Sequence, residues 1–452
     1  MPYENEFAGY RPLHRIVECE RVKQLLQRAR IFQPADGDDA ITPVTAPVEP
    51  GILPKFVVAI DGSRAEVQVD EEVKYPGARI GYCTVASVLI DLDLVERLDA
   101  NRPVDPQLFR KTEKASSIDA ALPGSNIVTR RQNSARSAFR EELYDHFQAI
   151  IIDEEDKTPL IDTYEILLAL KPGTHSQRCP YFEDDGCEHE FRKIPDGVSH
   201  CPSCQRPVYS TDALRIHERF NPLGTNEEAF TYVMQVWEKL LLIHLLRILE
   251  RRSLFQHVHN LAFFLDGPLA VFGPPAWLSA ALSRELKRLN AEARLLTGND
   301  IIVLGIEKTG EFASHFDEID RGLTPGKPFF EPRQYLMPKD SYIKERIQQS
   351  ASQKRFGMDT YFGRKFFYKT KGGARIVANI PFLTEAQDRL DTDDVSLFPR
   401  FSADCALLDR LVSSRYPNAL SPLISAHAEA SIPLNLGAKV LQQLAQALIG
   451  ER

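Results

Sequence analysis

The sequence has no long apolar run. Its longest stretches, such as "LLLIHLL" (240–246), are far shorter than the roughly 20 apolar residues that a membrane-spanning helix needs. The first residues, "MPYENEFAGYRPLHR", also lack the basic-then-apolar layout of a signal peptide. With 43% hydrophobic and 26% charged residues, the composition is that of a soluble globular protein. We therefore expect a cytoplasmic protein with no membrane partner.

An excess of basic residues is also missing. The chain of 452 residues has 63 Asp and Glu against 55 Lys and Arg, which gives a formal net charge of −8. This balance argues against a protein that coats nucleic acid non-specifically. It does not exclude a nuclease, because an enzyme can hold metal ions between carboxylates, close DNA in a local basic channel and still be acidic overall.

The cysteines do not have the pattern expected of disulfides. There are seven, an odd number, and four of them crowd into residues 179–204. Clustering of this kind indicates metal ligands. The other three stand alone, and we expect them to be buried as small unpaired thiols: Cys19, Cys83 and Cys405.

The clustered cysteines resemble a stretched zinc ribbon. The second pair is a C-x-x-C knuckle whose thiolates grip one tetrahedral Zn²⁺, and the first pair is spaced more widely than usual. We predict a structural zinc site, closed to chemistry by four protein ligands, in an insertion over 172–212. His189 and His200 are alternatives to one of the cysteines. The predicted ligands are Cys179, Cys187, Cys201 and Cys204.

Periodicity along the chain predicts an α/β protein. Residues 11–31 have the pattern of an amphipathic helix, and 34–54 that of a linker. Two strands joined by a turn follow, which suggests antiparallel pairing, and strand–helix–strand crossovers come later. We expect a mixed sheet flanked by helices. The predicted strands are 55–64, 78–98, 259–273, 299–310 and 375–383, and the predicted helices include 137–152, 159–171, 225–253 and 275–295.

Two aspartates stand at the ends of predicted core strands. Asp61 and Asp266 each follow an apolar run and precede a glycine. Carboxylates on neighbouring strands could bind Mg²⁺ or Mn²⁺, which polarises a phosphate and activates water in nucleases. Asp-Gly is also a common turn, so each instance alone is weak evidence.

The predicted helix 225–253 offers a third carboxylate. Glu250 continues the apolar stripe of that helix, so its side chain needs a partner, and a metal ion would serve. An ion pair with Arg247, Arg251 or Arg252 is the alternative. Glu238, nearer the edge of the same stripe, is the rival carboxylate.

Four motifs resemble those of the NurA nucleases, and they occur in the same order: "VVAIDGSR" (57–64), "FFLDGPL" (263–269), "VLGIEKTG" (303–310) and "RYPNALSPLISAH" (415–427). The resemblance covers roughly residues 50–440. It implies an RNase H-like mixed sheet flanked by helices, related to the nuclease domain of Argonaute proteins. It also implies a homodimer, Mn²⁺-dependent cleavage of DNA, and partnership with the HerA hexameric ATPase that translocates DNA.

The resemblance also implies roles for individual residues. The metal ligands would be Asp61, Glu250 and Asp266, with His427 as a further ligand or a proton shuttle. Tyr416 would steer the scissile phosphate, and Lys308 would clamp it electrostatically. The segment from Tyr416 to His427 is longer than in archaeal members, and the cysteine cluster is not typical of the family.

The expected organisation has four parts. A helix and linker occupy 1–50, the nuclease domain 51–440 with the zinc-ribbon-like insertion within it, and a tail 441–452.

A basic and aromatic stretch, 354–375, is a possible DNA contact. Its cations could neutralise phosphates while its rings stack on unpaired bases. The alternative is a strand pair with a buried aromatic face and a solvated basic face. The predicted contacts are Arg364, Lys365, Lys369 and Lys371.

The sequence therefore predicts a metal-dependent DNA nuclease, exonuclease or single-strand endonuclease, in DNA end processing, repair or anti-phage defence. Two alternatives stay open. One is a non-cleaving subunit that grips DNA for a ring ATPase, and the other is an Argonaute-like nuclease that acts on RNA. The residues do not separate DNA from RNA, since that choice rests on contacts to the 2′-hydroxyl.

Overall fold

The computed structural model describes residues 11–29, 41–47, 51–69, 77–93, 113–173, 176–322, 328–388, 392–413, 418–431, 440 and 442–444. They belong to two compact units, Met1–Ile41 and Thr42–Arg452. Among the described residues, no helix combines the length and the apolar character needed to cross a membrane.

The first unit holds two short helices where the sequence predicted one. α1 (Arg11–Glu18) and α2 (Glu20–Arg28) are separated at Cys19, whose backbone is extended (φ −67°, ψ 111°) and so interrupts the helix. Cys19 is half-buried, whereas Cys83 and Cys405 are buried as predicted.

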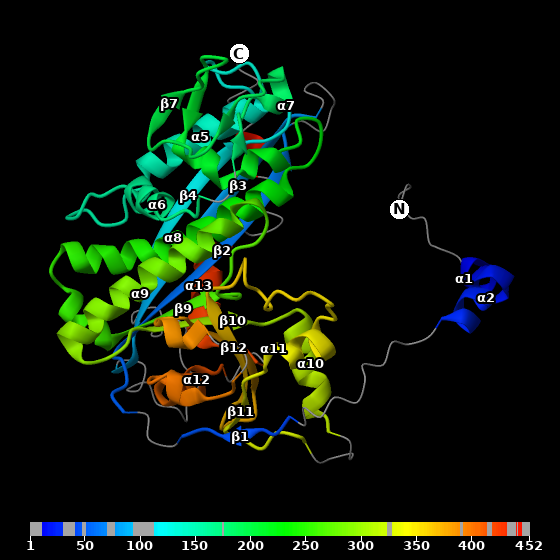
Figure 1. Ribbon diagram of the computed structural model, residues 1–452, viewed down its shortest axis with the longest axis vertical. Helices are drawn as coiled ribbons and strands as arrows, with labels where there is room; N and C mark the ends of the chain where they lie inside the picture. The colour runs from blue at the N-terminus through cyan, green and yellow to red at the C-terminus, as the bar shows by residue number, and fades with distance from the viewer. Residues whose placement is uncertain are drawn as a thin grey trace. The chain divides into compact units, whose positions relative to one another are not determined.

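The second unit is organised around a nine-stranded mixed sheet of order β1-β11-β12-β13-β10-β9-β2-β3-β4 (Figure 1). β2, β3 and β4 pair antiparallel, β9 and β10 run parallel to β2, and the strands from β13 to β1 pair antiparallel again. The strands are β1 (Val44–Thr45), β2 (Phe56–Gln68), β3 (Arg79–Asp91), β4 (Glu113–Pro123), β9 (Leu261–Asp266), β10 (Ile302–Glu307), β11 (Gln334–Leu336), β12 (Gly363–Lys369) and β13 (Arg375–Pro381).

This sheet confirms the predicted α/β class and the antiparallel pairing of the first two predicted strands. One difference is β1, which lies inside the stretch 34–54 predicted as a linker. Its two residues pair with β11 at the edge of the sheet. A strand this short leaves no periodic signal in the sequence.

Helices cover both faces of the sheet. Successive residues of a strand point to opposite faces, so alternate residues of β2 belong to two different hydrophobic clusters. On β2, Val58 and Ile60 face a cluster formed with α5, α6, α8 and α9, while Val57 and Ala59 face a cluster formed with α12 and α13. The helices are α5 (Ala135–Ala149), α6 (Leu160–Ala169), α8 (Glu227–Arg251), α9 (Leu278–Thr297), α10 (Glu311–Asp320), α12 (Phe401–Leu411) and α13 (Ser421–Ala430). Burial on both faces explains why this part of β2 reads as a continuous apolar run.

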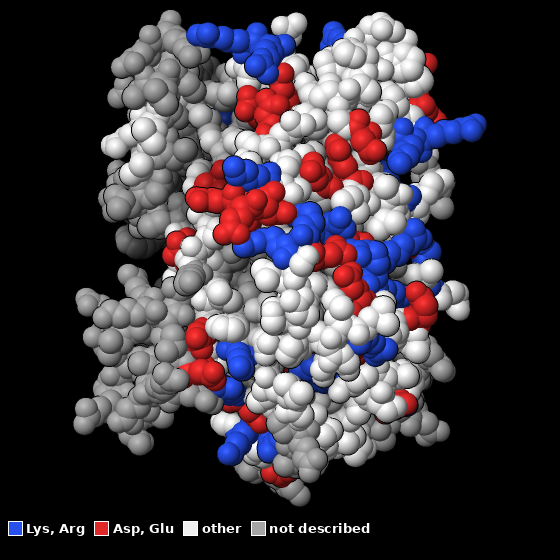
Figure 2. Space-filling model, turned by 90° about the vertical axis from the view of Figure 1, so that its left-hand side faces the viewer, with Lys and Arg blue, Asp and Glu red and all other residues white. Residues whose placement is uncertain are grey.

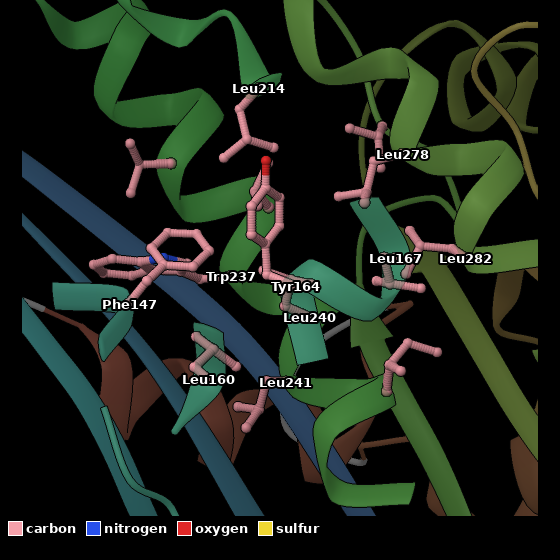
Figure 3. Close-up of a cluster of buried hydrophobic side chains, with 14 of the residues drawn as sticks. Phe147, Leu160, Tyr164, Leu167, Leu214, Trp237, Leu240, Leu241, Leu278 and Leu282 are labelled. Atoms are coloured by element: carbon pink, nitrogen blue, oxygen red, sulfur yellow. The ribbon is translucent and has the colours of Figure 1, made fainter. Parts of the chain in front are cut away.

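The core beneath α8 is aromatic and aliphatic (Figure 3). Trp237 is fully buried and packs against Phe147 of α5, with ring centroids 6.0 Å apart. Phe147 also meets Tyr164 of α6 edge-on, at 5.3 Å. At the start of α8, Glu66 of β2 accepts hydrogen bonds from the Thr225 hydroxyl and from the Asn226 backbone N–H, the latter at 2.9 Å. Contacts at its start and in its middle therefore fix α8 against the sheet.

The insertion between α6 and α8 contains two small hairpins. β5 pairs with β6 and β7 with β8. Arg140 of α5 fastens it to the domain: its guanidinium donates two hydrogen bonds of 2.7 Å to Asp212 and lies 4.4 Å from the centre of the Tyr181 ring. Both charged side chains are buried. The elements are β5 (Gln177–Arg178), α7 (Phe182–Asp185), β6 (Glu190–Phe191), β7 (Val198–His200), β8 (Pro207–Tyr209) and the 3₁₀ helices η1 (Ser210–Leu214) and η2 (Ile216–Arg219).

Replacing Arg140 with Met should destabilise the protein strongly, because Asp212 then stays buried without its cation. We expect the free energy of unfolding to fall by about 3–5 kcal/mol, measured by urea denaturation. The double variant Arg140→Met/Asp212→Asn should recover part of this loss. As a control, Lys354→Met breaks an exposed ion pair with Asp359 and should cost less than about 1 kcal/mol. Equal losses for Arg140→Met and Lys354→Met would contradict the buried ion pair's role.

Candidate functional site

Asp61 and Asp266 lie side by side on the sheet. β2 and β9 run parallel with Ile60 opposite Leu265, so the next residue of each strand is an aspartate on the same face. The prediction placed Asp61 at a strand end, but β2 continues to Gln68. Asp61 is buried, and it lines a pocket at the point where β9 ends at Asp266 while β2 continues.

A histidine and a lysine from other elements complete this face. His427 of α13 has its Nδ1 atom 2.9 Å from Asp61 Oδ2, and 60% of its side chain is exposed. Lys308, just after β10, has its Nζ atom 2.8 Å from Asp266 Oδ2. Ligand atoms of Asp61, Asp266 and His427 all lie within 4.8 Å of one another. Carboxylate oxygens with one imidazole suit Mg²⁺ or Mn²⁺.

A third carboxylate reaches this site from the opposite face of the sheet, and it belongs to Glu238. α8 crosses β2 at Gly62, where a Cβ atom would lie 2.7 Å from Glu238 Oε1 and 2.6 Å from Met234 Cγ. The missing side chain at Gly62 therefore leaves the space that the Glu238 carboxylate occupies beside Asp61. Glu238 is 5% exposed, and its Oε2 atom accepts a hydrogen bond of 2.7 Å from the buried Lys239.

The prediction that Glu250 lies with the two aspartates is wrong. Glu250 pairs with Arg288 of α9, with distances of 2.6 and 3.0 Å. It lies twelve residues beyond Glu238 (238 to 250), about 18 Å along the helix. The periodicity predicted that Glu250 continues a buried stripe, but α8 is buried on all sides from Val236 to His244, and Glu250 is only half-buried. The periodicity also carried no information about which turn of the helix crosses the site.

The alternative partners predicted for Glu250 are also engaged elsewhere. Arg247 pairs with Glu285, Arg251 with Asp156, and Arg252 with Asp153 and Glu155. Figure 2 shows the face turned toward the viewer with acidic and basic side chains interleaved across its middle. The ion pairs of Glu250 and of the three arginines favour a structural role for these residues.

The acidic residues share one pocket of about 330 Å³, lined by Asp61, Glu238, Lys239, Asp266, Phe272 and His427 among others. Burial raises the pKa of Asp61 to about 7, Asp266 and Glu238 add to this rise, and His427 and Lys308 oppose it. Burial also raises the pKa of Glu238, which Lys239 opposes. The folded chain thus holds carboxylates in a place that disfavours their negative charge, and a divalent cation there would favour it.

The predicted DNA contacts on β12 are a second correction. Arg364 is buried and donates to the carbonyls of Pro338 and Thr392. Lys365 is buried against Glu307, and Lys369 against Asp320 at 3.0 Å. β12 lies inside the sheet with both faces covered, so its cations stabilise the interior and do not reach a DNA phosphate.

The predicted roles of two further residues, Lys371 and Tyr416, stay predictions. Lys371 is exposed, so its contact with DNA stays a prediction. Tyr416 lies outside the described residues.

The four clustered cysteines form a second site with the dimensions of a metal centre. Their sulfur atoms are 3.9 Å apart for Cys179 and Cys204 and 3.8 Å apart for Cys187 and Cys201. Zinc–sulfur bonds of about 2.3 Å place the sulfurs of a tetrahedral site about 3.8 Å apart. None of the four is in a disulfide.

The two histidines proposed as alternative ligands lie outside this group. His200 is exposed, and the ring of His189 packs edge-on against Phe191 with centroids 4.7 Å apart. The group that can hold a metal is therefore made of four cysteines.

Fold and site together define an α/β protein with an acidic, metal-suited pocket over the central strands of a mixed sheet. The NurA domain matches residues 56–432, and the chain belongs to the NurA domain family. This membership supports a nuclease and confirms the resemblance seen in the motifs.

Two solved structures are similar to the chain. One is the NurA nuclease from Sulfolobus solfataricus, at 11% identity and a TM-score of 0.36, with 98% of each chain covered. The other is described as NurA, at 11% identity and a TM-score of 0.28, with 97% of this chain and 95% of that one covered. No curated protein matches the chain.

Gly62→Ala should weaken cation binding, because the added Cβ atom would meet the Glu238 carboxylate and Met234. We expect divalent-cation affinity to fall by about 10- to 100-fold, the usual effect of disturbing the support of a metal site. Calorimetric titration with Mn²⁺ measures this. Gly372→Ala, where nothing lies within 4 Å of the added atom, is the control and should bind as the wild type does. Unchanged cation affinity in Gly62→Ala would contradict a contribution of Glu238 to the cation site.

Proposed function

We propose that this protein is a metal-dependent DNA nuclease whose cation site is formed by Asp61, Glu238, Asp266 and His427. The observation that carries the proposal is the convergence of three carboxylates and an imidazole, from both faces of the sheet, on one pocket. Oxygen-rich sites of this kind hold the ions used for phosphodiester hydrolysis. Membership of the NurA family supports the same chemistry.

We also propose that the core is RNase H-like. The order of the five strands on one side of the sheet supports this: β4, β3 and β2 pair antiparallel, and β9 and β10 follow in parallel, so that in chain order the five strands lie as third, second, first, fourth and fifth. The acidic site then lies where the first and fourth core strands are neighbours.

The side chains have distinct proposed roles. Mn²⁺ or Mg²⁺, when bound, would polarise the scissile phosphate and lower the pKa of an attacking water. Asp61 and Asp266, held by the β2–β9 register, fix the position of the cation, and Glu238 completes the negative charge from the other face. Lys308 can turn from Asp266 to a phosphate oxygen, and the exposed imidazole of His427 can accept or deliver a proton.

The setting of this activity is proposed from the family resemblance. A homodimer that works with a HerA-type hexameric ATPase would act on DNA ends, in repair or in anti-phage defence, in the cytoplasm. Tyr416 would orient the phosphate.

Asp61→Asn and Glu238→Gln should each reduce cleavage of linear DNA by about 10²–10³-fold, because a weakened cation site loses the electrostatic stabilisation that the cation would give to the reacting phosphate. Glu250→Gln is the matched control: it removes the same charge from the same helix, and it should cleave at close to the wild-type rate. The assay follows end-labelled DNA with Mn²⁺, Mg²⁺ or EDTA, with and without the partner ATPase.

The outcomes separate the possible functions. Loss of activity in Glu250→Gln with full activity in Glu238→Gln would reverse the assignment of the helical carboxylate. An absence of cleavage by the wild type under every condition would favour a subunit that grips DNA without cutting it. Preferential cleavage of a matched RNA would favour an RNA nuclease.

We further propose that the four cysteines hold one structural Zn²⁺, because their sulfur spacing fits tetrahedral thiolate coordination. Cys201→Ser should lose the zinc measured by elemental mass spectrometry, and residues 176–209 should become sensitive to protease, since zinc binding and folding of such modules are coupled. Cys19→Ser, which changes a cysteine of the other unit, should keep its zinc. A wild-type protein with no zinc, or with another metal, would contradict the proposal.

A further inference from the structure

A second and larger cavity, of about 610 Å³, lies beside the insertion. The insertion contributes Arg178 and Phe182 to its wall, η2 contributes Arg219, and the segment before α9 contributes Gly273 and Pro274. Its volume is within the usual range for sites that hold small ligands. That size suits a few nucleotides of one strand better than a duplex.

This groove adjoins the acidic pocket along one chain segment. Ala270 and Phe272 line the acidic pocket, and the next two residues, Gly273 and Pro274, line the groove. Phe272 is 37% exposed between the two. The two cavities are therefore neighbours along this segment of the chain.

α8 forms a second connection between the two cavities. Glu238 lines the acidic pocket, and Tyr232, six residues earlier and about 9 Å along the helix, lies against Gly273, where a Cβ atom would be 2.4 Å from its ring. Arg219 is the last residue of η2, and η2 packs against α8.

The groove offers cations and an aromatic surface. The Arg178 guanidinium lies 4.5 Å from the centre of the Phe182 ring, and both Arg178 and Arg219 are exposed. Across the described part of the chain, neither forms an ion pair. Arg215, a third arginine of the groove, is paired with Glu218 at 2.8 Å.

Acidic side chains also line the groove, so its overall charge is not positive. Glu218 is neutralised by Arg215, Glu190 accepts a hydrogen bond of 2.7 Å from Ser176, and Glu183 is exposed. Binding of a strand must therefore depend on the two available arginines and on stacking, which is how proteins hold single-stranded nucleic acid.

We propose that this groove binds single-stranded DNA continuous with the strand in the acidic pocket, and that the cysteine module guides that strand. Cys179, next to Arg178, belongs to the four-cysteine site, so a metal bound there would fix the position of the arginine. The inference rests on the proposed nuclease function, which supplies the strand, and it adds a substrate site outside the cation site.

The test compares two double variants of equal charge. Arg178→Gln/Arg219→Gln removes two of the three groove arginines and leaves Arg215, which is paired with Glu218, and Arg192→Gln/Lys193→Gln removes two exposed cations of the same module that do not line the groove. Binding of fluorescent oligothymidylate is measured by anisotropy at several salt concentrations, without added Mn²⁺ or Mg²⁺ and without a chelator, so that the cysteine module keeps its metal. Loss of two phosphate contacts should lower the slope of log K against log salt by about 1.4, at about 0.7 per contact. The control should keep the wild-type slope.

Cleavage of bis(p-nitrophenyl) phosphate separates this inference from the proposed function. This small diester needs only the cation site, so the groove variant should hydrolyse it as the wild type does while losing kcat/KM on the oligonucleotide. A groove variant with the wild-type salt slope, or one that loses duplex binding but keeps oligothymidylate binding, would overturn the inference. A wild type that hydrolyses neither substrate would refute the nuclease, and the binding measurement would still test the groove.

Discussion

The site depends on one electrostatic constraint, the crowding of Asp61, Asp266 and Glu238 around one pocket, with Asp61 and Glu238 buried. Burial and mutual repulsion hold the pKa of Asp61 at about 7. Crowded, poorly solvated carboxylates oppose folding, so the scaffold must impose the arrangement. The β2–β9 register sets the spacing of the aspartates, and the packing of Trp237 holds α8 so that Glu238 meets Gly62. A bound cation would relieve the repulsion, which couples cation binding to the order of the pocket.

α8 links the parts of the domain that function requires. Its start is held by Glu66 of β2, its middle supplies Glu238, and its end is fastened by ion pairs from Arg251 and Arg252. The turn near Tyr232 adjoins the groove of the cysteine module. A helix fixed at both ends can hold a carboxylate and a groove wall at a constant separation, which suits a strand that spans both cavities.

The distribution of basic residues limits which cations could contact DNA in the proposed function. The concentrated basic stretch supplies buried ion pairs between β12 and its neighbours, such as Lys369 with Asp320. Cations used inside the protein are not available to phosphates. In the proposed nuclease, strand binding would rest on exposed cations such as Arg178 and Arg219, and the salt dependence would grow with the number of phosphates that they contact.

The sequence by itself determined the features that local patterns encode: the α/β alternation, the strand-associated Asp61 and Asp266, and the cysteine quartet with its knuckle. The motifs also indicated His427 and Lys308, which the structure brings to the aspartates. Only the tertiary structure placed Glu238 beside Asp61 and paired Glu250 with Arg288, because helical phase does not tell which turn of α8 crosses β2. It likewise showed that Arg364, Lys365 and Lys369 are buried. The sequence did not indicate this, because the charged residues of a strand do not tell whether both of its faces are covered. These are long-range facts, set by which elements pack together, and no short stretch of sequence contains them.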